Sequence, residues 1–214
     1  MHEDFEARII KALQAHEPQE MTVPGARAAA VLIPIVLAPE PELIFTVRTD
    51  TVSSHKGQIS FPGGSLDRPD EPRVAAALRE TAEEIGLDPP VVRVIGELDT
   101  FPTFVSGYVV TPFVGLLDDE PRLTLSPAEV ADVLRVPIVS LSNEIRREPG
   151  FTYRDRTYPT EAWVFEDHVI WGVTARILHQ FLEILGMAGI VDPPAGDGSW
   201  TIPPGQAGIG GPPA

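Results

Sequence analysis

Apolar side chains near the start of the chain recur first at helical spacing and then at strand spacing. An amphipathic helix is predicted over residues 4–15, where apolar positions lie three or four residues apart: Phe5, Ile9, Ile10 and Leu13. We expect this helix to be peripheral. The β-like runs AAAVLIPIVL and ELIFTVR follow, and because APEP separates them they are predicted to form a hairpin or a pair of strands in one sheet.

Strands and helices both continue along the rest of the chain. Three further runs are strand-like: VVRVIGEL, YVVTPFVGLL and EVADVLRVPI. Helical spacing appears over residues 71–85 and again over residues 171–185. Beyond Gly186 the chain is too rich in Pro and Gly for a packed element. The pattern predicts a fold of mixed α and β elements in three parts: an N-terminal helix and lead-in (1–25), a main domain (26–186) and a Pro/Gly-rich tail (187–214).

The composition fits one globular domain. Of 214 residues, 43% are hydrophobic and 22% are charged, which supplies a full core. The longest apolar run, residues 28–38, contains Pro34 and is too short to cross a bilayer, and the N-terminus lacks the basic start of a targeting segment. The chain has no cysteine, which excludes disulfides and cysteine-ligated metals and suits a reducing compartment. We expect a cytoplasmic protein without membrane contact.

The net charge of −15 limits the classes of partner. A protein that follows a nucleic-acid backbone needs clustered Lys and Arg, so no nucleic-acid partner is expected. An acidic protein that binds a phosphate compound needs divalent cations between the two. The expected partner is a small molecule, and a homodimer is left open as the oligomeric state.

Carboxylates are concentrated on the helix predicted over residues 71–85. Like charges one turn apart on a helix cost roughly 0.2–0.5 kcal/mol per pair. On a helical wheel one face carries Glu80, Glu83 and Glu84. The opposite face is expected to pack on the core through Val74, Leu78 and Ile85. For an isolated helix, a solvated acidic surface would explain this pattern about twice as often as a functional site.

The residues around this helix favour the functional interpretation. The helix has capping signals at both ends: Asp70 or Glu71 at its start, Pro72 in its first turn and Gly86 at a left-handed stop. The loop before it contains PGG, which lets the backbone come close to a ligand. Backbone carbonyls and carboxylates are the oxygen ligands that Mg²⁺ takes together with substrate phosphates.

The segment from Gly64 to Leu87 resembles the Nudix box: Gly, five residues, Glu, seven residues, Arg-Glu-aliphatic-x-Glu-Glu-x-Gly-aliphatic. The matching residues are Gly64, Arg79, Glu80, Glu83, Glu84, Ile85, Gly86 and Leu87. The chain departs from the motif at two positions. Thr81 stands where an aliphatic residue is usual. Six residues rather than five separate Gly64 from Glu71, so Asp70 and Glu71 compete for the first acidic position.

The preceding stretch, LIFTVRTDTVSSHKGQISFPGG, is similar to the signature of the coenzyme A pyrophosphatases within that family. The matching residues are Arg48, Gly57, Phe61, Pro62, Gly63 and Gly64. Ser53 stands where the signature has a second Arg, and His55, Lys56 or Arg48 is expected to meet an anionic group in its place. The expected substrate-binding residues are Arg48, His55, Lys56 and Gln58. Ordinary exposed loop positions would explain His55 and Lys56 equally well.

The resemblance implies an α+β fold, a Nudix-type α/β/α sandwich with a mixed β-sheet. It also implies hydrolysis of a diphosphate that links a nucleoside to a second group. Mg²⁺ or Mn²⁺ is expected at Glu80 and Glu84, with Glu83 and the Gly63 carbonyl nearby. Arg79 is expected to orient a glutamate through its planar fork rather than to touch substrate.

The general base is left open. Glu83 is preferred, and a glutamate on a later loop, Glu161 or Glu166, is the alternative. Glu129 is interpreted as an ordinary charge at a strand edge.

Three functions are compatible with these residues. The first is hydrolysis of coenzyme A to 4′-phosphopantetheine and adenosine 3′,5′-bisphosphate. The second is hydrolysis of another diphosphate such as NADH or ADP-ribose. The third is a Nudix-fold binding module without catalysis. The intact set Glu80, Glu83 and Glu84 argues against the third, because a binding module has no need for three repelling carboxylates. The upstream signature favours the first over the second.

Overall fold

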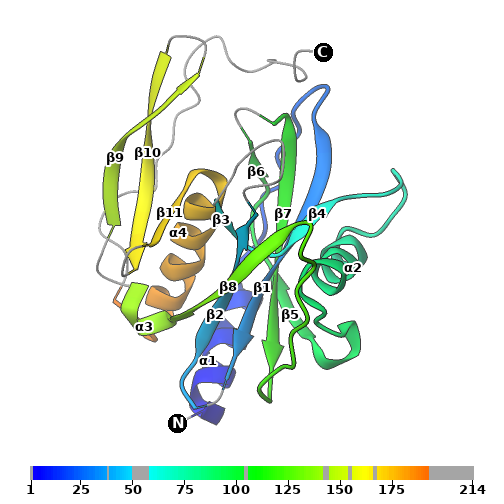
Figure 1. Ribbon diagram of the computed structural model, residues 1–214. Coiled ribbons are helices and arrows are strands. Elements are labelled where there is room, and N and C mark those ends of the chain that lie inside the picture. Colours follow the sequence, from blue (N-terminus) through cyan, green and yellow to red (C-terminus); the bar gives the residue numbers. More distant parts are fainter. Residues whose placement is uncertain are drawn as a thin grey trace.

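Figure 1 shows the computed structural model, which describes residues 2–37, 39–49, 58–103, 106–141, 145–153, 156–165 and 168–192. The elements are α1 (His2–Ala15), β1 (Arg27–Val36), β2 (Glu42–Arg48), β3 (Ile59–Ser60), β4 (Gly63–Ser65), α2 (Arg73–Ile85), the 3-10 helix η1 (Pro89–Val91), β5 (Arg93–Glu97), β6 (Phe101–Pro102), β7 (Tyr108–Leu117), β8 (Val130–Pro137), α3 (Ile138–Leu141), β9 (Ile145–Tyr153), β10 (Arg156–Phe165), β11 (His168–Trp171) and α4 (Gly172–Met187). Ser53, His55, Lys56, Glu166 and the tail from residue 193 onward lie outside the described residues. No helix in the described part of the chain is long and apolar enough to cross a membrane.

The main sheet is mixed, as predicted, and has eight strands within the described residues. Its path runs β3-β2-β1-β7-β5, with β4 paired to β1, β6 to β7 and β8 to β2. β1 and β7 run parallel, beginning with Arg27 opposite Tyr108. The other pairs in this sheet are antiparallel. The predicted hairpin is confirmed, since Ile35 of β1 lies opposite Leu43 of β2.

Helices cover both faces of this sheet, so the predicted sandwich is confirmed (Figure 1). Because side chains alternate along a strand, β1 contributes to a core on each face. Ile33 and Ile35 belong to the apolar cluster that includes residues of α1 and α4. Leu32 and Val36 belong to the cluster that includes residues of α2. The sheet therefore separates α2 from α1 and α4.

Helix α1 is part of the core, so the expectation of a peripheral helix is wrong. Ile9 and Leu13 are buried in the same cluster as the apolar residues of α4. Arg8 also donates a 2.8 Å hydrogen bond to the carbonyl oxygen of Ala188, just after α4. The helical spacing correctly predicts an apolar stripe, but a stripe does not reveal which element it faces.

The sequence pattern does not predict the second sheet, in which β10 pairs with β9 and β11. Trp163 of β10 is fully buried, and its indole N–H donates a 3.2 Å hydrogen bond to the carbonyl oxygen of Ala175 in α4. Pro159 obscures the strand, because Pro is normally excluded from central strand positions. The register with β9 shifts between Tyr158 and Thr160, so Pro159 lies at an irregularity of the ladder.

Helix α2 lies within two residues of its predicted start, but its cap differs from the prediction. Pro72 occupies the N-cap position and no side chain caps the helix, so the caps expected from Asp70 or Glu71 are wrong. The Glu71 carboxylate is used instead in an ion pair. Gly86 adopts the predicted left-handed conformation, with φ 69°, and its N–H bonds to the carbonyl oxygen of Ala82.

Candidate active site

Strand β4 brings the PGG loop against both β1 and α2. Gly63 has φ 143° and pairs with Val31 of β1. A Cβ at Gly63 would lie 2.4 Å from the carbonyl oxygen of Ala30. On its other side, the Gly63 N–H donates a 3.1 Å hydrogen bond to Oε2 of Glu84. Only glycine permits this close approach, which places loop backbone within hydrogen-bonding distance of the acidic helix.

The carboxylate of Glu80 lies directly against Gly64. A Cβ at Gly64 would be 2.5 Å from both Cδ and Oε2 of Glu80. The Glu80 side chain is largely buried, and its Oε1 accepts a 2.8 Å hydrogen bond from Arg79. Each of the two glycines therefore lies in close contact with one carboxylate of the helix.

Glu84 points into the protein, so the predicted division of α2 into an acidic face and an opposite core face is wrong at this residue. It is 5% exposed. The buried side of α2 comprises Ala76, Ala77, Thr81, Glu84 and Ile85. The wheel misplaces this side because it gives weight to large apolar residues, whereas small alanines let a helix lie close to a sheet.

The electrostatic surroundings of Glu84 are unusual for a glutamate. Burial raises its pKa to about 7, and the nearby charges of Glu129 and Glu80 raise it as well. The hydrogen bond from Gly63 and the positive charge of Arg48 act in the opposite direction. The site therefore holds a buried carboxyl group that is affected by the charges of two other glutamates and one arginine.

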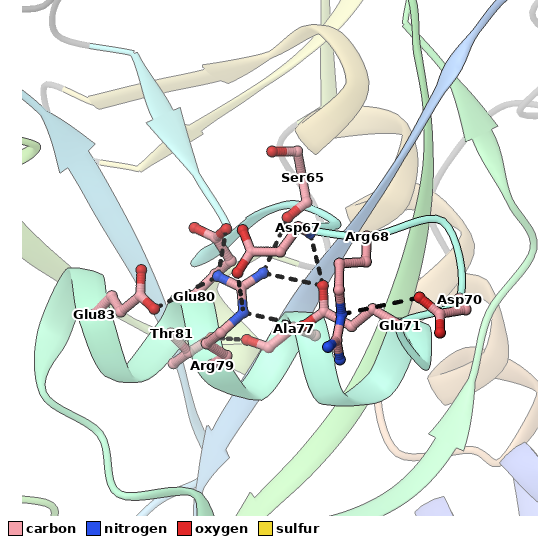
Figure 2. A network of polar contacts seen from close by, with 10 residues as sticks. All are labelled: Ser65, Asp67, Arg68, Asp70, Glu71, Ala77, Arg79, Glu80, Thr81 and Glu83. Carbon is pink, nitrogen blue, oxygen red and sulfur yellow. Dashed lines mark hydrogen bonds and ion pairs between the residues drawn. The ribbon is translucent and has the colours of Figure 1, made fainter.

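Arg79 is the centre of a network of polar contacts between α2 and the loop before it (Figure 2). Its Nε and Nη2 donate to the two carboxylate oxygens of Glu71 at 3.0 and 3.3 Å. Nη2 also donates to the Ser65 carbonyl oxygen at 3.1 Å, and Nη1 donates to Glu80. Nη1 lies 3.5 Å from a carboxylate oxygen of Glu83. The guanidinium fork thus ties the loop to the helix and holds the Glu80 carboxylate.

Glu71 occupies the first acidic position of the motif, and Asp70 does not. The Asp70 side chain is 86% exposed and lies 3.9 Å from Arg68. Glu71 is largely buried and accepts a 2.7 Å hydrogen bond from the Asp67 N–H. The hydrogen bonds from Arg79 and from this N–H lower the pKa of Glu71. The extra residue is accommodated in the loop, and the spacing from Glu71 to Arg79 is kept.

Two other motif positions are explained by their surroundings. Thr81 is buried, and its Oγ1 donates a 2.7 Å hydrogen bond to the carbonyl oxygen of Ala77. Its hydroxyl is therefore satisfied within the helix, so Thr can stand where an aliphatic residue is usual. The Glu83 side chain is 61% exposed, which makes it the most solvent-facing of the three glutamates expected to bind metal.

The donor atoms suit a hard divalent cation. Glu80 and Glu84 offer carboxylate oxygens one helical turn apart, and the charge of Glu129 acts on Glu84 as well. A cation that prefers oxygen ligands would relieve this repulsion. Within the described ranges, no three His, Asp or Glu side chains already converge on a single metal position. A cation at Glu80 and Glu84 would therefore take further oxygens from backbone, water or substrate.

The charge of Glu129 acts on Glu84, an effect that the interpretation of Glu129 as an ordinary strand-edge charge does not predict. The Ser126 N–H donates a 2.8 Å hydrogen bond to the carbonyl oxygen of Glu84, and the Thr124 N–H donates to that of Ile85. The carbonyl oxygen of Glu129 accepts a hydrogen bond from Thr49 at the end of β2. These contacts place an exposed carboxylate where its charge acts on Glu84. No local pattern in SPAEVADV indicates this, because the proximity depends on where α2 ends.

The structure does not bring Glu161 together with the acidic helix. Glu161 lies on β10, opposite Arg147 of β9, so its expected position on a loop is wrong. β10 packs against α3 and α4, and Figure 1 shows it across the molecule from α2. The misplacement follows from the strand that Pro159 obscures. Glu166, His55 and Lys56 lie outside the described residues, and their roles stay predictions.

Arg48 and Gln58 are neighbours in the backbone but not in their side chains. The Arg48 N–H donates a 3.0 Å hydrogen bond to the Gln58 carbonyl oxygen. The Gln58 amide nitrogen lies near Gly172, 3.8 Å from where a Cβ there would be, at the start of α4. The Arg48 charge acts on Glu84, within α2. The two residues expected to bind substrate thus have different neighbours, and their roles stay predictions.

Comparison with known proteins assigns the family. The model of the NUDIX domain family matches residues 26–159, more than half of the chain. A Photorhabdus laumondii protein described as "Uncharacterized Nudix hydrolase NudL" is 38% identical over 172 residues, which are 80% of this chain and 91% of that protein. A protein of the same description from Escherichia coli K12 is 39% identical over 163 residues, 75% of this chain and 84% of that protein.

Among solved structures, the Nudix hydrolase RenU from M. smegmatis is 20% identical, with a TM-score of 0.45 over 53% of this chain and 72% of that one. This likeness is too distant to carry an argument. The family match and the two relatives agree with the glycine loop and acidic helix described above. The chain therefore belongs to the Nudix hydrolase family, whose members generally use divalent metal cations.

Proposed function

We propose that the protein hydrolyses the diphosphate linkage of coenzyme A and its derivatives. The observation that carries this proposal is the direct contact between the FPGG end of the upstream signature and the acidic helix, through Gly63 N–H and Glu84. The signature of the coenzyme A enzymes is thus physically joined to the residues that bear the chemistry. The products would be 4′-phosphopantetheine and adenosine 3′,5′-bisphosphate.

Each residue of the β4–α2 site would have its own role in the hydrolysis. Glu80 and Glu84 would hold Mg²⁺ or Mn²⁺, with Glu83 and the Gly63 carbonyl as further donors. When bound, the cation supplies charge neutralisation at the diphosphate and lowers the pKa of a water molecule. Arg79 keeps the Glu80 carboxylate in position through its 2.8 Å hydrogen bond. In the reaction, a water oxygen bonds to one phosphorus, the anhydride P–O bond breaks, and the water gives up a proton.

A carboxylate near the helix is the best acceptor for that proton. Glu83 remains the first choice because it is exposed on the same helix. Glu129 becomes the second choice because it lies outside the helix and acts on Glu84 electrostatically. Glu161 is less favoured, since its strand packs against α3 and α4.

A panel of substrates tests this proposal against its alternatives. Coenzyme A, dephospho-coenzyme A, NADH and ADP-ribose are incubated with Mg²⁺ or Mn²⁺, and the products are resolved by mass. We expect coenzyme A to give the highest kcat/KM, because a site built for its 3′-phosphate loses a charged contact with analogues that lack it. Cleavage of ADP-ribose or NADH without cleavage of coenzyme A would favour the broader Nudix activity. Binding without turnover of any substrate would favour a non-catalytic module.

The same panel addresses the missing arginine at Ser53. If Lys56 meets the 3′-phosphate instead, Lys56→Ala lowers kcat/KM for coenzyme A and leaves dephospho-coenzyme A unchanged. Equal wild-type values for the two substrates would mean that the 3′-phosphate is not recognised.

A further inference from the structure

Arg48 carries an unused hydrogen-bond donor on the α2 side of the sheet. Along β2, Ile44 belongs to the cluster beneath α2, and Arg48 follows four residues later on the same face. The ladder with β8 shifts register between Val47 and Arg48, but the extra residue is Ala131 of β8, so the alternation along β2 continues. Within the described part of the chain, the buried Nε of Arg48 has no hydrogen-bond partner.

The backbone around Arg48 is fixed on both sides. Its N–H bonds to the carbonyl oxygen of Gln58, on the side of β3. The next residue, Thr49, bonds through N–H to the carbonyl oxygen of Glu129 and through Oγ1 to that of Ala128, on the side of β8. The strand end is thus held between two segments, so the base of the guanidinium side chain is preorganised.

Glu84 does not use this donor. Its charge and that of Arg48 act on each other, but Oε2 of Glu84 accepts the Gly63 N–H and no hydrogen bond joins it to Arg48. A buried guanidinium N–H without a partner is costly, so an anion that supplies the missing acceptor is favoured at this position. The protein groups around Glu84 are already carboxylates, namely Glu80 and Glu129, and none of them is hydrogen-bonded to this donor. The missing acceptor is therefore expected to be an anionic group of the substrate.

We propose that Arg48 binds the substrate's diphosphate itself and not the 3′-phosphate of the nucleotide. The inference rests on the proposed function for the identity of the substrate, but only on diphosphate chemistry for the role of Arg48. The diphosphate must lie beside Glu80 and Glu84 if these residues hold the cation that binds it. Arg48 follows Ile44 on the face of β2 that α2 covers, and its charge acts on Glu84. The 3′-phosphate is attached at the ribose, away from the bond that breaks. Arg48 therefore does not replace the arginine missing at Ser53.

Kinetics on two substrates separates these roles. Arg48→Gln and Arg48→Lys are compared with wild type on coenzyme A and dephospho-coenzyme A, and Arg93→Gln serves as the matched control. Arg93 pairs with Glu6 and Asp118, outside the site. We expect Arg48→Gln to lower kcat/KM by about 10- to 100-fold, the effect of losing one charged hydrogen bond, by the same factor on both substrates. Arg48→Lys should recover part of the loss, and Arg93→Gln should match wild type.

A binding measurement makes the test independent of the substrate's identity. Titration of imidodiphosphate, a stable diphosphate analogue, into the Mn²⁺-loaded protein should show at least tenfold weaker binding by Arg48→Gln than by wild type. If wild type cleaves ADP-ribose and not coenzyme A, the proposed function fails while this titration still tests Arg48. A loss confined to coenzyme A, or unchanged imidodiphosphate affinity, would overturn the inference. Far-UV circular dichroism establishes folding. If Arg48→Gln does not fold, Arg48→Lys is used instead and should show a smaller loss of kcat/KM by the same factor on both substrates, together with weaker imidodiphosphate binding than wild type.

Discussion

At the scale of single residues, the site contains one glutamate whose burial in its charged form is unfavourable for the stability of the fold. Glu84 is 5% exposed, and the burial and neighbouring acids that raise its pKa to about 7 disfavour its charged form. The hydrogen bond from the Gly63 N–H and the charge of Arg48 offset only part of this rise in pKa. A group that is unfavourable for the fold and lies beside a glycine loop is typical of functional sites.

This cost predicts a pH-dependent gain in stability for Glu84→Gln. A carboxyl group whose folded pKa is about 7 and whose ordinary value is 4.5 favours the folded state below pH 4.5, and that advantage is lost as the pH rises to about 7. In the presence of a chelator, Glu84→Gln should raise the free energy of unfolding by about 1–3 kcal/mol at pH 8 and by much less at pH 5. Urea unfolding at both pH values measures this. The exposed residue Glu83 provides the control, and an equal gain for Glu83→Gln would argue against burial as the cause.

The same substitution should remove the response to metal. Because Glu84 is an expected ligand, Mn²⁺ should raise the Tm of the wild type through binding to the folded state, and should raise that of Glu84→Gln far less. Turnover should be largely lost in the variant although it remains folded. Thermal unfolding with and without Mn²⁺ checks the binding separately from activity. An identical rise in Tm for both proteins would place the cation elsewhere.

At the scale of elements, the site is a junction between β4 and α2 that depends on glycine. Gly63 meets β1 on one side and Glu84 on the other, while Gly64 seats Glu80. Arg79 closes the junction by bonding to Glu71, Ser65 and Glu80 (Figure 2). The helix therefore presents its carboxylates in positions that the loop determines.

Gly64→Ala should damage the site more than the fold. The added Cβ would come within 2.5 Å of the Glu80 carboxylate, which has to move. We expect a fall in kcat/KM of at least about tenfold, the effect of misplacing one charged ligand group, with a small change in Tm. Gly25→Ala is the comparison: its φ of 79° strains a residue with a Cβ, but a Cβ there meets nothing within 4 Å, so Tm should fall while kcat/KM is kept. Full activity of Gly64→Ala would show that Glu80 does not need its present position.

The sequence predicts the elements of this junction better than their orientation. Strong apolar runs identify β1, β2 and β7, and the motif identifies α2, because these signals are local. The inward direction of Glu84 is not predictable from the wheel, since the alanines that admit α2 to the sheet are weak apolar signals. Glu71 could not be separated from Asp70 by spacing alone, and the ion pair with Arg79 decides between them. The proximity of Glu129 arises from contacts between distant segments, which no local pattern contains.

At the scale of the whole molecule, the sheet separates two regions with different roles. α2 and the acidic site lie on one side, and α1, α4 and the β9–β11 sheet lie toward the other (Figure 1). Glu129 reaches the acidic site because β8 pairs with β2 at the end where Arg48 lies. Glu161 belongs to the other region.

This separation predicts unequal effects for two glutamates. Glu129→Gln should lower kcat by at least about tenfold if its carboxylate accepts a proton or assists the metal site, whereas Glu161→Gln should change kcat little. The pH profile of kcat distinguishes a proton acceptor from a structural role, since loss of the base removes the acidic limb. A larger loss of kcat for Glu161→Gln than for Glu129→Gln would indicate that the general base lies on β10.

The central claim is that β4 and α2 form a metal-dependent site that cleaves the diphosphate of coenzyme A. The most direct measurement is mass analysis of the products from coenzyme A after exhaustive chelation, and again after Mg²⁺ or Mn²⁺ is restored, for wild type and Glu84→Gln. We expect 4′-phosphopantetheine and adenosine 3′,5′-bisphosphate from the metal-restored wild type, and almost no product from the chelated protein or from the folded variant. Full activity of the chelated wild type, or wild-type turnover by Glu84→Gln, would contradict the account.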